Sequence, residues 1–122
     1  IIGSGVAGLC MAIALRRRGD TDFVLLERAS DVGGTWRDNT YPGAACDVPS
    51  HLYSYSFEPN PGWSRLYAPG AELKAYASRV ADKYELRPWM RFGASVEQVV
   101  YDEPGKYWTV SVKDQAPADS DS

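Results

Sequence analysis

The sequence predicts an α/β fold that opens with a strand, a helix and a second strand. An apolar strand end at residues 1–2 leads into a Gly-x-Gly-x-x-Gly turn, residues 3–8, and then into a helical stretch. A continuous apolar run, residues 23–26, follows and ends in Glu27, 19 positions after the last glycine of the turn. This order of strand, glycine turn, helix, strand and acid is typical of Rossmann-like βαβ units, which bind dinucleotides.

The glycine turn predicts a phosphate site. In this motif the first glycine permits a tight turn, the second lets the backbone approach a diphosphate, and the third lets the helix pack closely on the strand. Backbone N–H groups at the start of the helix would face the phosphates, helped by the positive end of the helix dipole. The expected binding residues are Gly3, Ser4, Gly5, Val6, Ala7 and Gly8, with Glu27 accepting hydrogen bonds from a ribose.

The first helix is expected to bury one face, because its apolar residues recur at positions i, i+3, i+4, i+7 and i+8. Arginines crowd its last turn, which suits the negative end of the helix dipole, and Gly19 is expected to cap it. We interpret the arginines as a solvated helix end. The apolar face comprises Val6, Leu9, Cys10, Ile13 and Ala14, and the arginines are Arg16, Arg17 and Arg18.

Composition excludes several classes of function. The chain is 44% hydrophobic with a formal net charge of −3, and outside the arginine cluster no basic patch suggests a nucleic-acid partner. No apolar run approaches the roughly 20 residues that a membrane span needs. Cys10 and Cys46 are expected to be free thiols in a reducing cytoplasm, and the sole histidine, His51, leaves no cluster with metal-ligand spacing.

Three motifs in the middle of the chain carry a resemblance to a known family. They are Gly-Gly-Thr-Trp at residues 33–36, Tyr-Pro-Gly-Ala-Ala-Cys-Asp at residues 41–47, and Tyr-Ser-Tyr-Ser-Phe at residues 53–57. A Gly-Gly pair after the ribose acid resembles flavoproteins that hold FAD in one dinucleotide fold and a nicotinamide nucleotide in another. The three motifs together resemble the Baeyer–Villiger class of flavin-containing monooxygenases, over essentially the whole chain but only the N-terminal part of that family.

The resemblance implies cofactor roles for several residues. Glu27 and the neighbouring Arg28 would lie at the adenosine ribose, and Gly34, Thr35 and Trp36 would line FAD from the diphosphate toward the flavin. Asp47 would lie near the isoalloxazine ring as the catalytic carboxylate, facing an arginine from beyond the chain. Ala45 and Cys46 would pass close to the nicotinamide cofactor, Tyr53 would contact the flavin side, and Val96 would flank the adenine through its backbone.

Simpler interpretations of these residues stay open. Asp47 precedes Val48-Pro49, where an aspartate often closes an Asx turn. The aromatic residues around Trp36 and Tyr53 can form the core of a packed loop, and Val96 can simply pack in a strand. His51 is expected to be a hydrogen-bonded loop residue, and Cys46 lacks a histidine partner for covalent catalysis.

The remainder of the chain is expected to form a helix and then strands. Leu73, Tyr76, Ala77, Val80, Ala81 and Tyr84 lie on one helical face, with Lys74, Arg79 and Lys83 as solvated charges. Residues 90–93 are expected to begin a third parallel strand. Residues 95–101 and 107–113 are expected to form a hairpin, with a type II turn at residues 103–106 and Trp108, Val110 and Val112 on the buried face.

These expectations define a partial FAD-binding domain. Residues 1–114 comprise the cradle and Gly-Gly motif (1–36), an aromatic loop (37–68), a helix (69–88), and strands with the hairpin (90–114), followed by a polar tail or linker (115–122). Neither a second glycine fingerprint for NADPH nor the remaining parallel strands are found, and only two residues precede the turn. The piece is therefore expected to be an incomplete portion of a flavoprotein with two dinucleotide-binding domains, partnered by the missing remainder of the same polypeptide.

The resemblance implies an NADPH-dependent enzyme that inserts one oxygen atom of O2 next to a ketone carbonyl and gives an ester or lactone. The substrate would be a small ketone, and the NADPH site would lie mostly outside this chain. This piece alone is expected to be inactive. The alternatives are a flavin monooxygenase that oxygenates nitrogen or sulfur, and a non-catalytic fragment that binds FAD or another nucleotide.

Overall fold

The computed structural model describes residues 1–115, and their centre is a small parallel sheet. Strand β1 (Leu25–Leu26) pairs in parallel with β2 (Met90–Arg91), so that Leu25 lies opposite Met90. On the other side of β1, Ile2 forms a parallel bridge with Leu26. Helix α1 (Val6–Arg17) connects Ile2 to β1. The predicted α/β class, the βαβ unit and the third parallel strand are confirmed.

Helix α1 buries a narrower face than its sequence pattern predicts. Its buried residues are Gly8, Leu9, Ala12 and Ile13. Val6 is 42% exposed and Ala14 is exposed as well, so the prediction was wrong for both. Val6 is the first residue of the helix, at the mouth of the glycine turn, where the rest of the chain does not cover it.

The last turn of α1 closes as a Schellman motif. Gly19 has a φ of +80°, its N–H donates to Arg16 O at 2.9 Å, and the N–H of Asp20 donates to Leu15 O at 3.0 Å. The predicted capping role of Gly19 is confirmed, although Gly19 lies one residue past the C-cap Arg18.

The sequence predicts that the arginines at this end are solvated, and this is correct for the exposed Arg18 but not for Arg16 and Arg17. Arg16 donates through Nη1 to the backbone oxygens of Tyr84 and Glu85, and its guanidinium lies 4.5 Å from the centroid of the Trp89 ring. Arg17 lies 4.5 Å from the centroid of Phe57. Periodicity within one helix could not predict these contacts, because their partners lie far along the chain.

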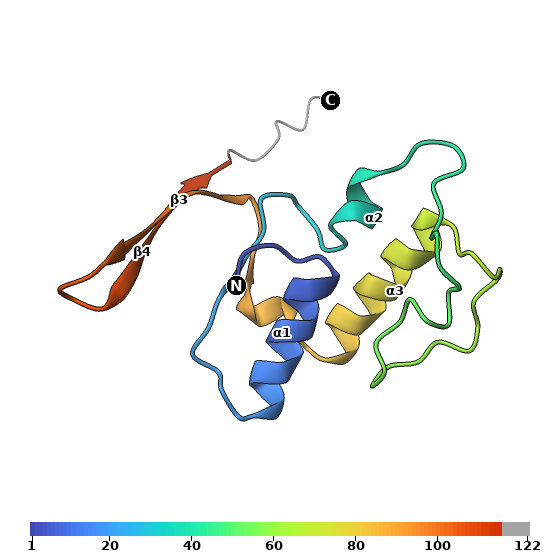
Figure 1. Ribbon diagram of the computed structural model, residues 1–122, viewed down its shortest axis with the longest axis horizontal. Coiled ribbons are helices and arrows are strands. Elements are labelled where there is room, and N and C mark those ends of the chain that lie inside the picture. The colour runs from blue at the N-terminus through green and yellow to red at the C-terminus, as the bar shows by residue number, and fades with distance from the viewer. Residues whose placement is uncertain (116–122) are drawn as a thin grey trace.

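Helix α3 (Gly70–Lys83) packs beside α1, and the short helix α2 (Thr35–Asp38) lies near its N-terminal end (Figure 1). The predicted buried face is confirmed for Leu73, Tyr76, Ala77, Val80 and Ala81. The helix ends at Lys83, earlier than the expected boundary at residue 88, because Glu85 takes a left-handed φ of 52°. The 3-10 helix η1 (Arg87–Trp89) then leads into β2.

Both lysines of α3 form ion pairs, which corrects the prediction that they are only solvated. Lys74 pairs with Asp31, and Lys83 Nζ lies 2.7 Å from Glu58 Oε1. Arg79 is exposed and lies over the Tyr76 ring. Through Lys74, α3 is connected to the segment between β1 and α2.

The aromatic loop between α2 and α3 contributes side chains to the core. Trp63 is 8% exposed, and Tyr53, Tyr55 and Phe57 pack against the buried cluster. The core itself forms between α1, α3 and β1, and its largest fully buried side chains are Leu9, Ile13, Leu25, Val32, Leu73, Val80 and Leu86. The strand predicted over residues 23–26 is only two residues long, and Val24, which precedes it, is 46% exposed.

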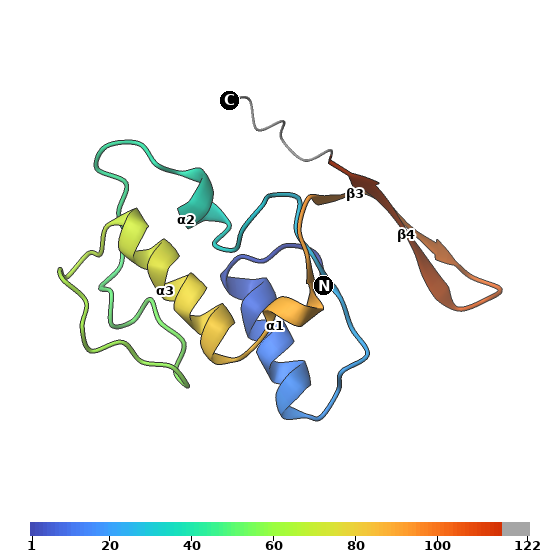
Figure 2. The same cartoon turned by 180° about the vertical axis from the view of Figure 1, so that it is seen from behind.

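The antiparallel hairpin formed by β3 (Ala94–Asp102) and β4 (Tyr107–Asp114) stands away from the helices (Figure 2). The hairpin is as predicted, with a register shift between Val96 and Gln98. Its turn is not type II, because the left-handed residue is Lys106, with a φ of 57°, and not Gly105. The predicted buried face is wrong for Trp108 and Val110, which are 63% and 41% exposed, whereas Val112 is partly buried.

Residues 116–122 lie outside the described residues, and with them most of the expected polar tail. Within residues 1–115, no helix combines the length and the hydropathy needed to cross a membrane. Cys10 and Cys46 are both free thiols, as predicted.

Candidate dinucleotide site

The glycine turn lies between Ile2 and α1, and two of its glycines are required by the protein itself. Gly3 has a φ of +87°, which side chains rarely permit. A Cβ on Gly8 would lie 1.9 Å from Gly3 O, so only glycine lets the first turn of α1 pack against the loop before it. These are the predicted roles of the first and third glycines.

Gly5 differs from both. Its φ is −75° and its ψ is −170°, which any residue can adopt, and a Cβ built on it would meet nothing closer than Gly34 Cα at 3.6 Å. Neither the backbone conformation nor the packing of the described residues therefore requires glycine here. The missing side chain leaves open space at the start of α1.

The Gly-Gly pair forms a second wall opposite the turn. Gly34 has a φ of +52°, and a Cβ on it would lie 3.0 Å from Gly5 Cα. The N–H of Gly33 donates to Ser4 O at 3.1 Å, so the two glycine segments are joined backbone to backbone. The predicted second place of close backbone approach thus lies directly against the first.

Two cavities meet at these glycine segments and share Ile2, Gly3, Gly5, Gly34 and Thr35. The first, of about 330 Å³, extends toward the hairpin and includes Glu27, Arg28, Arg37, Asp38, Ala94, Ser95 and Val96. The second, of about 320 Å³, extends along α1 and includes Val6, Ala7, Gly8, Gly33, Trp36 and Tyr53. Together they form one elongated groove over bare backbone, which suits a dinucleotide better than a compact ligand.

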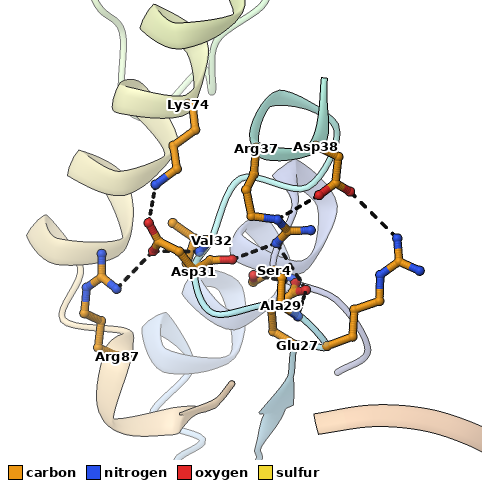
Figure 3. A network of polar contacts seen from close by, with 10 residues as sticks. Ser4, Glu27, Ala29, Asp31, Val32, Arg37, Asp38, Lys74 and Arg87 are labelled. Carbon is orange, nitrogen blue, oxygen red and sulfur yellow. Dashed lines mark hydrogen bonds and ion pairs between the residues drawn. The ribbon is translucent and has the colours of Figure 1, made fainter. Parts of the chain in front are cut away.

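Glu27 is the buried acid of the first cavity, with 3% of its surface exposed. Its Oε2 accepts hydrogen bonds from Ser4 N at 2.8 Å and Ser4 Oγ at 2.7 Å, and its Oε1 accepts one from Ala29 N at 2.9 Å (Figure 3). Burial raises the pKa of this carboxyl, but the hydrogen bonds of Ala29 and Ser4 and the charge of Arg37 outweigh burial and lower the pKa below its ordinary value. Glu27 is therefore an ionised acceptor fixed beside the turn.

Arg37 is the functional-site residue that the sequence analysis missed. Its Nη1 lies 3.1 Å from Glu27 Oε1 and donates to Asp31 O at 2.7 Å, while its Nε donates to Asp38 Oδ1 at 2.9 Å (Figure 3). Only 15% of its side chain is exposed. The one sign of its role in the sequence was its position directly after Gly-Gly-Thr-Trp. In the structure, α2 turns the side chain of residue 37 back toward Glu27.

Asp31 extends this network to α3. Its carboxylate pairs with Lys74, and Oδ1 lies 3.5 Å from Arg87 Nη1. Burial raises the pKa of Asp31, but the hydrogen bonds of Lys74 and Val32 lower it below its ordinary value. The loop that carries the Gly-Gly pair is therefore held by charged contacts on both of its sides.

Trp36 and Tyr53 meet at the far end of the second cavity. The Trp36 Nε1–H donates to Tyr53 Oη at 3.0 Å, and the two rings lie edge to face with centroids 5.8 Å apart. Both side chains are half-buried. They form an aromatic wall with a polar contact, which can bound a flat aromatic ligand.

Other predicted site residues lie outside both cavities. Asp47 and Ala45 are exposed, and Cys46 is buried in the core at 4% exposure. Cys46 N donates to Ala68 O at 2.9 Å, so this segment is paired with the chain just before α3. His51 is exposed too. Within residues 1–115, no group of histidine, cysteine, aspartate and glutamate side chains is arranged to hold a metal ion.

The glycine turn, the buried acid and the parallel strands define a dinucleotide-binding unit. Residues 1–69 match the family of NAD(P)-binding Rossmann-like domains, and because this match covers more than half of the 122 residues, the chain belongs to that family.

Within this family the chain is similar to monooxygenases. It is 54% identical over 110 residues to a Baeyer–Villiger monooxygenase of Streptomyces coelicolor. The matched region covers 90% of the chain and 21% of that protein. A solved steroid monooxygenase bound to NADP matches 91% of the chain with a TM-score of 0.85 and 45% identity. The structure of OTEMO in complex with FAD and NADP matches 94% with a TM-score of 0.85 and 33% identity.

These findings confirm the resemblance to the Baeyer–Villiger class. The chain spans 21% of the length of its Streptomyces relative and 22% of each of the two solved chains.

Proposed function

We propose that this chain is the FAD-binding portion of an NADPH-dependent Baeyer–Villiger monooxygenase, which inserts one oxygen atom of O2 next to a ketone carbonyl. The similarity to a Baeyer–Villiger monooxygenase and to structures bound to FAD and NADP supports this class over enzymes that oxygenate nitrogen or sulfur. Because the chain covers about a fifth of these relatives, the activity is proposed for the full-length protein.

The observation that carries the proposal is the bare backbone at Gly5. The protein's own conformation requires glycine at Gly3 and its packing requires glycine at Gly8, but neither requires glycine at Gly5. Its missing side chain opens the place where two cavities join, between the start of α1 and the Gly-Gly pair. A diphosphate needs close approach to backbone N–H groups at such a turn. The residues present therefore fit FAD.

The two cavities divide the proposed cofactor contacts. Glu27 and Arg28 would bind the adenosine ribose, with Val96 beside the adenine. The diphosphate would lie against Gly3, Gly5, Val6, Ala7, Gly8, Gly34 and Thr35. The predicted contact Ser4 is fully buried, lines neither cavity and donates to Glu27, so it would support the site from behind. Trp36 and Tyr53 would bound the flavin end. Val96 and Glu27 lie 69 positions apart, and their place in one cavity supports this division.

FAD, once reduced by NADPH, supplies the activation of O2 and the transfer of oxygen. The chain's own residues bind and orient: Glu27 accepts hydrogen bonds from the ribose, backbone N–H groups neutralise phosphate charge, and the aromatic wall excludes water. We propose that Asp47, exposed in the loop, orients an arginine from another part of the polypeptide through a charge-assisted pair. Ala45 and Cys46 would pass close to the nicotinamide cofactor.

The activity is tested with the full-length protein. We expect NADPH consumption that depends on a ketone, with an ester or lactone as product. Products of nitrogen or sulfur oxidation without ester would contradict the Baeyer–Villiger assignment, and a purified protein without visible flavin absorbance would contradict FAD binding altogether.

Gly5→Ala tests the proposed diphosphate site at the glycine turn directly. The added Cβ meets only an ordinary contact at 3.6 Å, so the variant should fold with unchanged thermal stability. It should weaken FAD binding by about tenfold or more, because it occupies the place of the diphosphate. Gly62→Ala is the matched control, since its Cβ meets nothing closer than 3.4 Å and Gly62 lines neither cavity. Unchanged FAD affinity in Gly5→Ala would refute the proposal that the diphosphate binds at Gly5.

A further inference from the structure

The buried carboxylate of Glu27 needs a positive charge, and one side chain supplies it. Three hydrogen-bond donors surround it, and all three are neutral, namely the N–H groups of Ser4 and Ala29 and the Ser4 hydroxyl. The positive charge is the guanidinium of Arg37, whose Nη1 forms an ion pair with Oε1 at 3.1 Å. An ionised carboxylate that is nearly excluded from water is costly unless it is paired.

Arg37 is also held in a fixed orientation. Nη1 donates to Asp31 O and Nε to Asp38 Oδ1, so three acceptors on the segment from residue 27 to residue 38 surround one planar group. The ion pair of Asp31 with Lys74 attaches this segment to α3. Arginine suits this place because its donors form a rigid fork, whereas a lysine offers a single charged nitrogen.

We propose that Arg37 is a positioning residue for FAD, which keeps Glu27 ionised and oriented so that Glu27 can accept hydrogen bonds from the adenosine ribose. This inference rests on the proposed function, because it takes the first cavity as the adenosine site. Arg37 lines that cavity together with Glu27. Its effect on FAD binding is exerted through the carboxylate of Glu27.

A double-mutant cycle in the full-length protein tests this role. The variants are Arg37→Gln, Glu27→Gln and the combination of both, and FAD is titrated into each apoprotein. Arg37→Gln should weaken FAD binding by about ten- to a hundredfold. This is the loss expected when the ribose no longer has its hydrogen bond to the charged carboxylate of Glu27. In the Glu27→Gln background the same change should alter the FAD dissociation constant by less than about twofold, because no carboxylate remains at residue 27 for Arg37 to hold ionised and oriented.

The conservative variant and a control sharpen the test. Arg37→Lys keeps the charge but not the fork, so its FAD affinity should fall between those of the wild type and Arg37→Gln. Arg79→Gln removes an exposed arginine of α3 that lines neither cavity and should bind FAD like the wild type.

Each outcome decides the inference. If Arg37→Gln does not fold, the double variant should fold and bind FAD like Glu27→Gln, because the unpaired buried charge is gone. Equal losses on both backgrounds, or a double variant that also fails to fold, would show a role independent of Glu27 and overturn the proposal. A wild-type protein that binds no FAD refutes the proposed function, whereas wild-type affinity in Arg37→Gln refutes only the role of Arg37.

Discussion

Single residues of the glycine turn differ in what they contribute, and Gly8 contributes packing. A Cβ at this position would lie 1.9 Å from Gly3 O, which is backbone and cannot rotate away. We expect Gly8→Ala to lower the free energy of unfolding by about 3 kcal/mol or more, at the upper end of overpacking effects. Thermal or urea unfolding measures the loss, with Gly62→Ala as the near-neutral comparison. A Gly8→Ala protein as stable as the wild type would show that the first turn of α1 can shift.

Glu27 makes stability depend on pH in a defined direction. Because its pKa in the folded chain lies below the ordinary value of 4.5, the unfolded chain takes up this proton first as the pH falls. The stabilisation is therefore complete above about pH 4.5 and is lost as the pH falls through the lower, folded-state pKa.

Glu27→Gln removes this dependence. At pH 7 we expect the variant to be less stable than the wild type by about 3 kcal/mol, because the guanidinium of Arg37 loses its buried partner. The difference between the two proteins should shrink in urea unfolding experiments as the pH is lowered below 4.5. A difference that stays constant from pH 7 to pH 3 would mean that folding does not lower the pKa of Glu27.

Elements are joined by side chains at their ends, and Arg16 is the clearest example. From the last turn of α1 it donates to two backbone oxygens just beyond α3 and stacks on Trp89. We expect Arg16→Gln to lower the midpoint of thermal unfolding, with a cost of about 1 to 2 kcal/mol for the lost charged hydrogen bonds and stacking. Arg18→Gln, at an exposed position two residues away, should change stability by less than about 0.5 kcal/mol. Equal effects of the two changes would contradict the role of Arg16 in joining α1 to the segment that follows α3.

The hairpin presents an apolar face to solvent. Tyr101 pairs with Trp108 and Val99 with Val110, and all four side chains are at least 38% exposed. Exposed apolar strands of this kind promote association. We expect the 122-residue chain to self-associate through this face at high concentration, and the double variant Trp108→Ser/Val110→Thr to elute as a monomer in size-exclusion chromatography.

Thr109→Ser, on the opposite face of β4, is the control for that measurement. It should elute like the wild type. Association that persists unchanged in the double variant would place the contact elsewhere on the molecule.

For the molecule as a whole, features that repeat locally could be predicted and long-range contacts could not. The buried face of α3 follows from spacing alone, and the glycine turn and Glu27 follow from motif order. The short strand at Leu25–Leu26 and the exposed hairpin depend on which other segments cover them, which periodicity does not record. The pairing of Arg37 with Glu27 depends on how α2 turns after the Gly-Gly pair, and the sequence gives no direct sign of that direction.

The backbone of Glu27 has a consequence for how the site is made. Its N–H donates to Arg91 O at 2.9 Å, and its C=O accepts from Ala94 N at 2.9 Å, so residues encoded more than 60 codons later fix the acid in place. While the polypeptide is being synthesised, the glycine loop and first helix leave the ribosome well before these partners do. The first cavity, which we propose as the adenosine site, is thus completed last, and on that proposal stable capture of FAD waits until Val96 has emerged.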